Sequence, residues 1–263
     1  KTLTADNVME ELQKTVEMEY DKTENKPKKI IGDLLPKVLE RLKIGSREDW
    51  LRVFEVGMQS LETKAVQVWM TRAEEEDLIE RYDGNGRLKP TVGDALAIIE
   101  ANIAGQKTDS AIEERVDHQV EVASDGSITD TVALTRTHTA PKGELFHGVN
   151  NVAYVRVYVP LGSELLAANG FETPSSSLFE VPLAEDTADL DELRLVQTLP
   201  SPLAEVDVTN EFGRTAFGGW IQLRPQETRT TTFRYKLPFT VFDLASRTGE
   251  LSALGSDTGA RKA

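Results

Sequence analysis

The spacing of apolar residues changes from a helical period to a strand period near Ile112. Residues 30–42 place apolar side chains three and four positions apart, on one face of a helix. From Ile112 onward apolar and polar residues alternate, as in strands with one covered face. We therefore predict an α+β fold, with a helical lobe and a few strands over residues 1–110 and an antiparallel β-sandwich over residues 111–240.

Local signals give the helical lobe more detail. Ser46 and Asp49 predict a capping box that starts a helix. The short apolar run at residues 65–70 (AVQVWM) predicts a strand. Residues 95–103 (ALAIIEANI) are apolar at nearly every position, which predicts a strand covered on both faces.

The strand-period segments predict an immunoglobulin-like sandwich. We expect antiparallel strands at residues 112–122, 128–139, 152–159, 206–209, 214–224 and 228–237. His118 falls in the apolar phase of the first strand, which predicts a hydrogen-bonded core histidine rather than a metal ligand. Residues 241–263 are rich in Ser, Gly and Ala, and we expect a flexible tail or linker there.

Charge and composition exclude several classes of protein. The chain carries 30 Lys and Arg against 44 Asp and Glu, a net charge of −14. An acidic chain is unsuited to nucleic acids and to anionic membrane surfaces, because both are bound largely through Lys and Arg. The absence of cysteine excludes disulfides, thiolate metal sites and cysteine nucleophiles. We expect no nucleic-acid partner and no membrane contact by this chain itself.

The acidic residues are concentrated in one segment. No Lys or Arg lies between Arg156 and Arg194, and seven carboxylates fall within residues 172–193. We interpret this segment as a solvated insertion, mobile because like charges repel one another. Asp186, Asp189 and Asp191 are the candidate ligands in the alternative interpretation, a calcium-binding loop.

Signatures of catalysis are lacking in the sequence. There is no HExxH pair for zinc, no GxSxG elbow and no SxxK motif, so no catalytic residue and no cofactor is assigned. Whether the chain is an enzyme stays open, with a non-catalytic role favoured. Tyr154, Tyr158 and Trp220 could form a face that stacks against carbohydrate, although a sandwich core or partner surface is the simpler interpretation.

The turn from Asn102 to Asp109 is the strongest site candidate. It follows an apolar strand and, on this reading, leads the chain from the helical lobe into the sandwich. We expect Asn102 to bond to turn backbone, Gly105 to take a positive φ, and Lys107 to pair with Asp109. The structural interpretation is that the turn sets how the two lobes sit. The alternative is a ligand-binding site.

Longer segments, taken in order, resemble a known bacterial family. They include "KKIIGDLLPKVLERL", "AIIEANIAGQKTDSAIEERVDHQVEVASDGSI", "NNVAYVRVYVPLGSELLAANG" and "NEFGRTAFGGWIQLRPQETRTTTFRYKLP". This succession resembles the domain-of-unknown-function 4012 family over roughly residues 2–238. Its most specific part is the Asn102–Asp109 turn, where that family tends to show Asn, Gly, Lys and an acidic residue.

The resemblance implies an uncharacterised extracytoplasmic protein of the cell envelope, held by an N-terminal membrane anchor that this chain lacks. It also implies that the helical lobe is the remnant of an α/β domain, incomplete at its N-terminus. We therefore expect a non-catalytic envelope module with a polysaccharide or protein partner. The alternative is the distal part of an envelope polysaccharide enzyme whose chemistry lies upstream.

Overall fold

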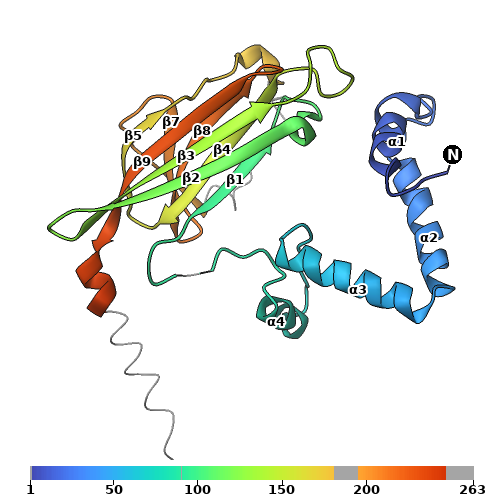
Figure 1. The fold of residues 1–263 in the computed structure, drawn as a ribbon, viewed down its shortest axis with the longest axis horizontal. Helices are drawn as coiled ribbons and strands as arrows, with labels where there is room; N and C mark the ends of the chain where they lie inside the picture. Colours follow the sequence, from blue (N-terminus) through green and yellow to red (C-terminus); the bar gives the residue numbers. More distant parts are fainter. Residues whose placement is uncertain (1, 90, 181–194, 247–263) are drawn as a thin grey trace, which may run out of the picture. The chain divides into compact units, whose positions relative to one another are not determined.

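The computed structural model describes residues 2–89, 91–180 and 195–246, and it divides into two compact units between Arg87 and Leu88 (Figure 1). The first unit is helical and the second is a two-sheet β structure, so the predicted α+β class is confirmed. The division lies well before the predicted boundary at residue 110. The reason is that β1 (Ala97–Asn102) pairs with β4 (Asn151–Pro160) and so belongs to the β unit.

The helical unit consists of short amphipathic helices. They are α1 (Val8–Lys14), continued by a π-helical turn (Thr15–Glu19), then α2 (Lys29–Lys43), α3 (Arg47–Glu62) and α4 (Ala73–Arg81). The predicted capping box starts α3, since Ser46 Oγ accepts from the Asp49 N–H at 3.2 Å and Asp49 Oδ2 accepts from the Ser46 N–H at 2.9 Å. In the described part of the chain no helix has the length and apolar character needed to span a bilayer.

The predicted strand at residues 65–70 is wrong. This segment is irregular, and the Val68 N–H donates to the Gly84 carbonyl at 2.9 Å. A strand needs a partner ladder for its backbone groups, and the described part of the helical unit contains no other strand. Of residues 2–87 only Glu76 and Gly84 are buried, so the apolar stripes of α2 and α3 are not covered within this unit.

The β unit contains two antiparallel sheets. The first has the strand order β1-β4-β8-β7-β6 and the second the order β2-β3-β9-β5. The strands not yet placed are β2 (Ile112–Val122), β3 (Ser127–His138), β5 (Glu164–Asn169), β6 (Val196–Leu199), β7 (Val206–Glu211), β8 (Arg214–Leu223) and β9 (Thr228–Thr240). A 3-10 turn at Thr108–Ala111 precedes β2, and another lies at Ser176–Leu178.

The core lies between the two sheets and follows from the alternation in the sequence. Each central strand turns every second residue inward, and those positions hold large apolar side chains. The fully buried ones include Leu134, Val157, Phe217, Phe233 and Tyr235. Adjacent rings contact one another, with the centroids of Phe217 and Tyr235 5.5 Å apart. This interleaving of aromatic and β-branched residues provides most of the apolar burial that stabilises the unit.

Two predictions about burial are wrong because the strands concerned lie at sheet edges. β1 is the outermost strand of its sheet, and Ile99 is half exposed rather than covered on both faces. β2 is the outermost strand of the other sheet. Its apolar side chains therefore lie at the edge of the sandwich, where no further strand covers them. Val116, Val120 and His118 are therefore exposed, and His118 is not a core histidine.

The start of the predicted tail is ordered. Residues 241–246 are helical, and Thr240 caps them by a reciprocal exchange with Asp243: the Asp243 N–H donates to Thr240 Oγ1 at 3.2 Å. Val241 and Leu244 pack against the core of the sandwich. Residues 247–263 lie outside the described residues.

Candidate functional site

The turn from Asn102 to Asp109 connects the two sheets rather than the two units. It leaves β1 in one sheet and enters β2 in the other. Asn102 Oδ1 accepts from the Gly105 N–H at 2.7 Å, and its Nδ2 donates to the Gln106 carbonyl and to Thr108 Oγ1, each at 3.3 Å. Thr108 is fully buried and donates to the Gly105 carbonyl at 2.6 Å. The expected role of Asn102 is confirmed.

Gly105 is required for a reason other than the predicted one. It is not among the described residues with positive φ, whereas Gln106 has a φ of 51°. A Cβ on Gly105 would lie 2.5 Å from Asn102 Oδ1, 2.8 Å from the Val152 nitrogen and 2.9 Å from the Asn151 Cα. The turn is therefore pressed against the backbone of β4, and no side chain fits between them.

Asn151, the first residue of β4, ties the turn to the body of the sandwich. Its side chain is fully buried, and its Nδ2 donates to Thr108 Oγ1 and to Asp109 Oδ1, both at 2.9 Å. Asn102, Gly105 and Asp109 are thus linked to one another through Thr108 and Asn151. Lys107 is exposed at the tip of the turn.

An ionic cluster that sequence reasoning missed lies directly behind this turn. Arg136 on β3 is 2% exposed, and its guanidinium forms ion pairs with Glu100 (Nη2 to Oε2, 3.0 Å) and Glu114 (Nε to Oε2, 3.2 Å). Its Nη1 also donates to Asn151 Oδ1 at 3.4 Å. We call Arg136, Glu100, Glu114 and Asn151 the Arg136 cluster. It joins β1 and β4 of one sheet to β2 and β3 of the other.

The pKa of Glu100 lies above the ordinary value for a glutamate side chain. Burial raises the pKa of Glu100 from 4.5 to about 8, and the neighbouring Glu114 carboxylate adds to the shift, while Arg136 opposes it. One guanidinium faces two acidic side chains, so the cluster retains one proton through neutral pH. The proton shared by Glu100 and Glu114, together with the buried guanidinium of Arg136, holds the two sheets together.

This raised pKa predicts that the β unit loses stability as the pH rises. Between pH 4.5 and 8 the folded state keeps a proton on Glu100 that the unfolded state releases, so unfolding becomes easier with increasing pH. We expect the free energy of unfolding to fall by on the order of 1–3 kcal/mol from pH 5 to pH 8.5. Glu100→Gln, which stays neutral, should remove most of this slope in denaturant titrations.

A matched control is Glu113→Gln, because Glu113 lies beside Glu114 on β2 and its side chain is on the opposite face of the strand. This variant should keep the wild-type slope. Equal pH dependence in wild type and Glu100→Gln would contradict the assignment of the retained proton to Glu100.

Aromatic side chains lie on the outer face of the five-stranded sheet. The Tyr154 and Trp220 rings are 5.0 Å apart and nearly perpendicular, and Phe179 lies 5.2 Å from Trp220. Tyr154 lies over Gly218, donates to Asp207 Oδ2 at 2.5 Å, and is itself covered by the guanidinium of Arg156 at 5.3 Å. We call Tyr154, Arg156, Phe179, Asp207 and Trp220 the aromatic face. Tyr158 is buried and does not belong to it.

The aromatic face combines flat apolar surface with charged groups at its edge. Tyr154 and Trp220 are partly exposed, and Arg156 is exposed. Burial and the Asp207 carboxylate raise the pKa of Tyr154, so its hydroxyl stays a donor at all physiological pH values. This combination suits a ligand with an apolar ring face and hydroxyl groups around its rim.

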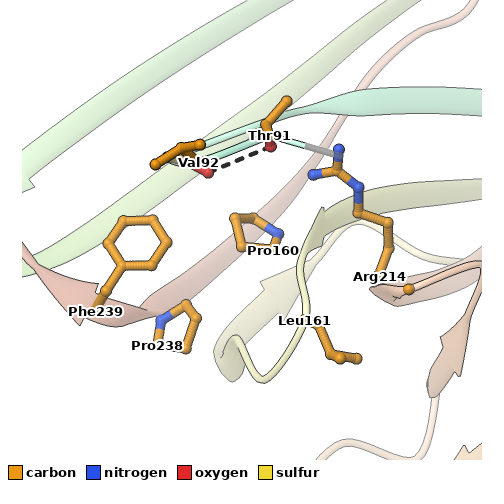
Figure 2. A pocket seen from close by; sticks show the side chains of 9 residues that line it. Thr91, Val92, Pro160, Leu161, Arg214, Pro238 and Phe239 are labelled. Atoms are coloured by element: carbon orange, nitrogen blue, oxygen red, sulfur yellow. Dashed lines mark hydrogen bonds between the residues drawn. The ribbon is translucent and has the colours of Figure 1, made fainter. Parts of the chain in front are cut away.

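A hollow of about 400 Å³ lies at the end of the sandwich remote from the Asn102–Asp109 turn. Residues Thr91, Val92, Pro160, Leu161, Arg214 and Phe239 line it (Figure 2). Arg214 is its one charged group, and the guanidinium donates to the Lys89 carbonyl at 2.6 Å. The hollow therefore marks where the segment before β1 meets the sheet, and we assign it no ligand.

The other candidates from the sequence are the calcium ligands and the core histidine. Asp186, Asp189 and Asp191 lie outside the described residues, as does most of the acidic insertion. The buried histidine is His138, whose Nε2 donates to the Val149 carbonyl at 2.9 Å. A signal for Arg136 was present in the sequence: it falls in the same alternating phase as the core residue Leu134.

Compared with protein-family models, with curated proteins and with solved structures, the chain gives no match. The class of protein is therefore argued from the geometry of its β unit.

Proposed function

We propose that this protein is a non-catalytic, extracytoplasmic module of the bacterial cell envelope that binds an envelope polysaccharide. The observation that supports binding is the aromatic face, with Trp220 and Tyr154 partly exposed beside Arg156 and Asp207. Sugar rings stack their C–H faces on aromatic side chains and place their hydroxyl groups against charged neighbours. The envelope location rests on the family resemblance of the sequence.

A polysaccharide fits this surface better than a protein partner of ordinary size. Arg156 and Asp207 are already held by contacts to Tyr154 within the same face, so both ring and charges are oriented before a ligand arrives. Preorganised groups bind with a smaller loss of conformational entropy. Repeating sugars can use one small platform several times along a polymer, which raises the overall affinity.

The test is binding of N-acetylglucosamine oligomers and of neutral glucans by calorimetry. We expect saturable binding to at least one polymer, and we expect Trp220→Ala to weaken it roughly fivefold or more, because a stacking contact is worth about 1–3 kcal/mol. Trp69→Ala is the matched control, since Trp69 is 71% exposed in the helical unit. No binding, or equal loss in both variants, would contradict the proposal.

The alternative, the distal part of a polysaccharide-processing enzyme, differs in one measurable outcome. Such a protein would change the length or the reducing ends of the polymer it binds. Binding that leaves the polymer unaltered supports the non-catalytic role.

A further inference from the structure

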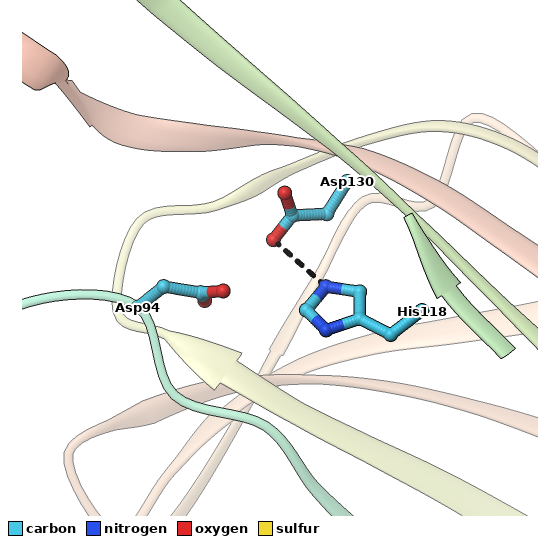
Figure 3. Close-up of side chains that lie close together, drawn as sticks. All are labelled: Asp94, His118 and Asp130. Carbon is cyan, nitrogen blue, oxygen red and sulfur yellow. Dashed lines mark ion pairs between the residues drawn. The ribbon is translucent and has the colours of Figure 1, made fainter. Parts of the chain in front are cut away.

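Three side chains with metal-binding atoms meet on the inner face of the four-stranded sheet, at its β2 edge. His118 comes from β2, Asp130 from β3, and Asp94 from the segment before β1 (Figure 3). One ligand atom from each lies within 4.8 Å of the others. His118 Nε2 lies 3.4 Å from Asp130 Oδ2. The three side chains point toward one another.

Asp130 lacks the contacts that a buried carboxylate requires. It is 0% exposed, and neither of its oxygens has a hydrogen-bond partner among the described residues. The hydroxyl of Tyr235, its neighbour on β9, is also buried without a partner. Leaving an ionised carboxylate in such a site is unfavourable by several kcal/mol unless a proton or a cation compensates it.

The neighbours of Asp130 supply only part of this compensation. His118 Nε2 lies 3.4 Å from Asp130 Oδ2, which is longer than a well-formed charged hydrogen bond. Asp94 brings a second negative charge to the same space, which by itself would repel Asp130. A bound dication would satisfy both carboxylates and explain why the chain brings them together.

We propose that Asp94, His118 and Asp130 bind a divalent transition-metal ion of the zinc class. One imidazole nitrogen and two carboxylate oxygens are ligands that zinc accepts, and three protein ligands leave a fourth position for water. Asp94 and His118 are exposed, so an ion reaches the site from solvent. The ion would link the segment before β1, through Asp94, to the edge strand β2 of the four-stranded sheet, through His118.

The effect of such an ion follows from where its ligands lie. Asp94 is 36 residues from Asp130 along the chain, and β2 is an edge strand with no further strand beyond it among the described residues. A metal bond between these elements would stabilise the folded state, because the unfolded chain does not assemble the site. The metal site shares no residue with the aromatic face. Metal binding and polysaccharide binding can therefore be tested, and can fail, independently.

The experiment is titration of the full chain, freed of metal with a chelator, by ZnCl₂ in calorimetry and by CoCl₂ in visible absorption. We expect one equivalent of metal to bind, with Co²⁺ bands typical of low coordination number and a rise in melting temperature. His118→Gln and Asp94→Asn should each weaken binding at least tenfold. A third variant, Asp130→Asn, removes a buried ligand and can fail to fold. Asp94 is exposed and lies outside the strands, so Asp94→Asn tests the site even in that case.

His147→Gln is the matched control, because His147 is a histidine beside a carboxylate, Glu144, at 3.3 Å but outside the cluster. It should bind metal as the wild type does. Absence of saturable Zn²⁺ and Co²⁺ binding, or the same affinity in His118→Gln and wild type, would overturn the proposal.

Discussion

Arg136→Met is expected to lower the free energy of unfolding by about 3–5 kcal/mol, the largest effect of any substitution considered for this protein. Methionine retains the apolar stem and removes the guanidinium that faces Glu100 and Glu114. Asn151 loses its contact to Arg136 at the same time. Glu100 and Glu114 then face each other without a cation, which favours further protonation or separation of the sheets. Urea unfolding followed by circular dichroism measures the loss.

A matched substitution and a second-site rescue separate charge from packing. Arg115→Met changes an arginine on β2 that forms an exposed pair with Asp117, and we expect a loss of no more than about 1 kcal/mol. Adding Glu100→Gln and Glu114→Gln to Arg136→Met should recover part of the stability, because the uncompensated charges are removed. A loss in Arg136→Met as small as in Arg115→Met would show that the cluster does not join the sheets.

Gly105→Val is expected to lower the free energy of unfolding by about 2–3 kcal/mol, because the new side chain overlaps the start of β4. The nearest atoms are Asn102 Oδ1 and the backbone of Asn151 and Val152, and backbone cannot rotate away. Relief of the overlap would break the contacts of Thr108 with Asn151. Thermal and denaturant unfolding both measure the effect.

Smaller substitutions in the same turn distinguish close approach from other causes. Gly105→Ala should already show most of the loss, since the Cβ alone is too close. Lys107→Ala should change stability by less than about 0.5 kcal/mol, because Lys107 is exposed. If Lys107→Ala leaves the melting temperature unchanged but abolishes polymer binding, the turn is a ligand site and its structural interpretation is wrong.

Two clusters of charged side chains lie on the inner face of β2 and β3, where the edge of the sandwich is not covered by a further strand. The Arg136 cluster lies at the end near the Asn102–Asp109 turn, and the proposed metal site lies further along the same pair of strands. Both place charged groups where edge strands leave the core uncovered. Edge strands with inward charges also resist pairing with other chains.

The alternating pattern in the sequence determined the β-sandwich and the polar turn. Strands β3 and β9 follow from strict alternation, since only one face of each is buried. The Ser124-Asp125-Gly126 turn joins β2 to β3, with Gly126 at a φ of 81°. The Asn102–Asp109 turn was recognisable because Asn, Gly and Asp bond locally to backbone.

Strand order was decided by the tertiary structure alone, because edge and central strands show the same local alternation. For this reason Ile99 and His118 were expected to be covered, although β1 and β2 lie at the edges. The partners of Arg136 and Asp130 come from segments 12 to 36 residues away, and no local spacing encodes such contacts. Which charged groups meet depends on which strands become neighbours, and that is set by packing of the whole core.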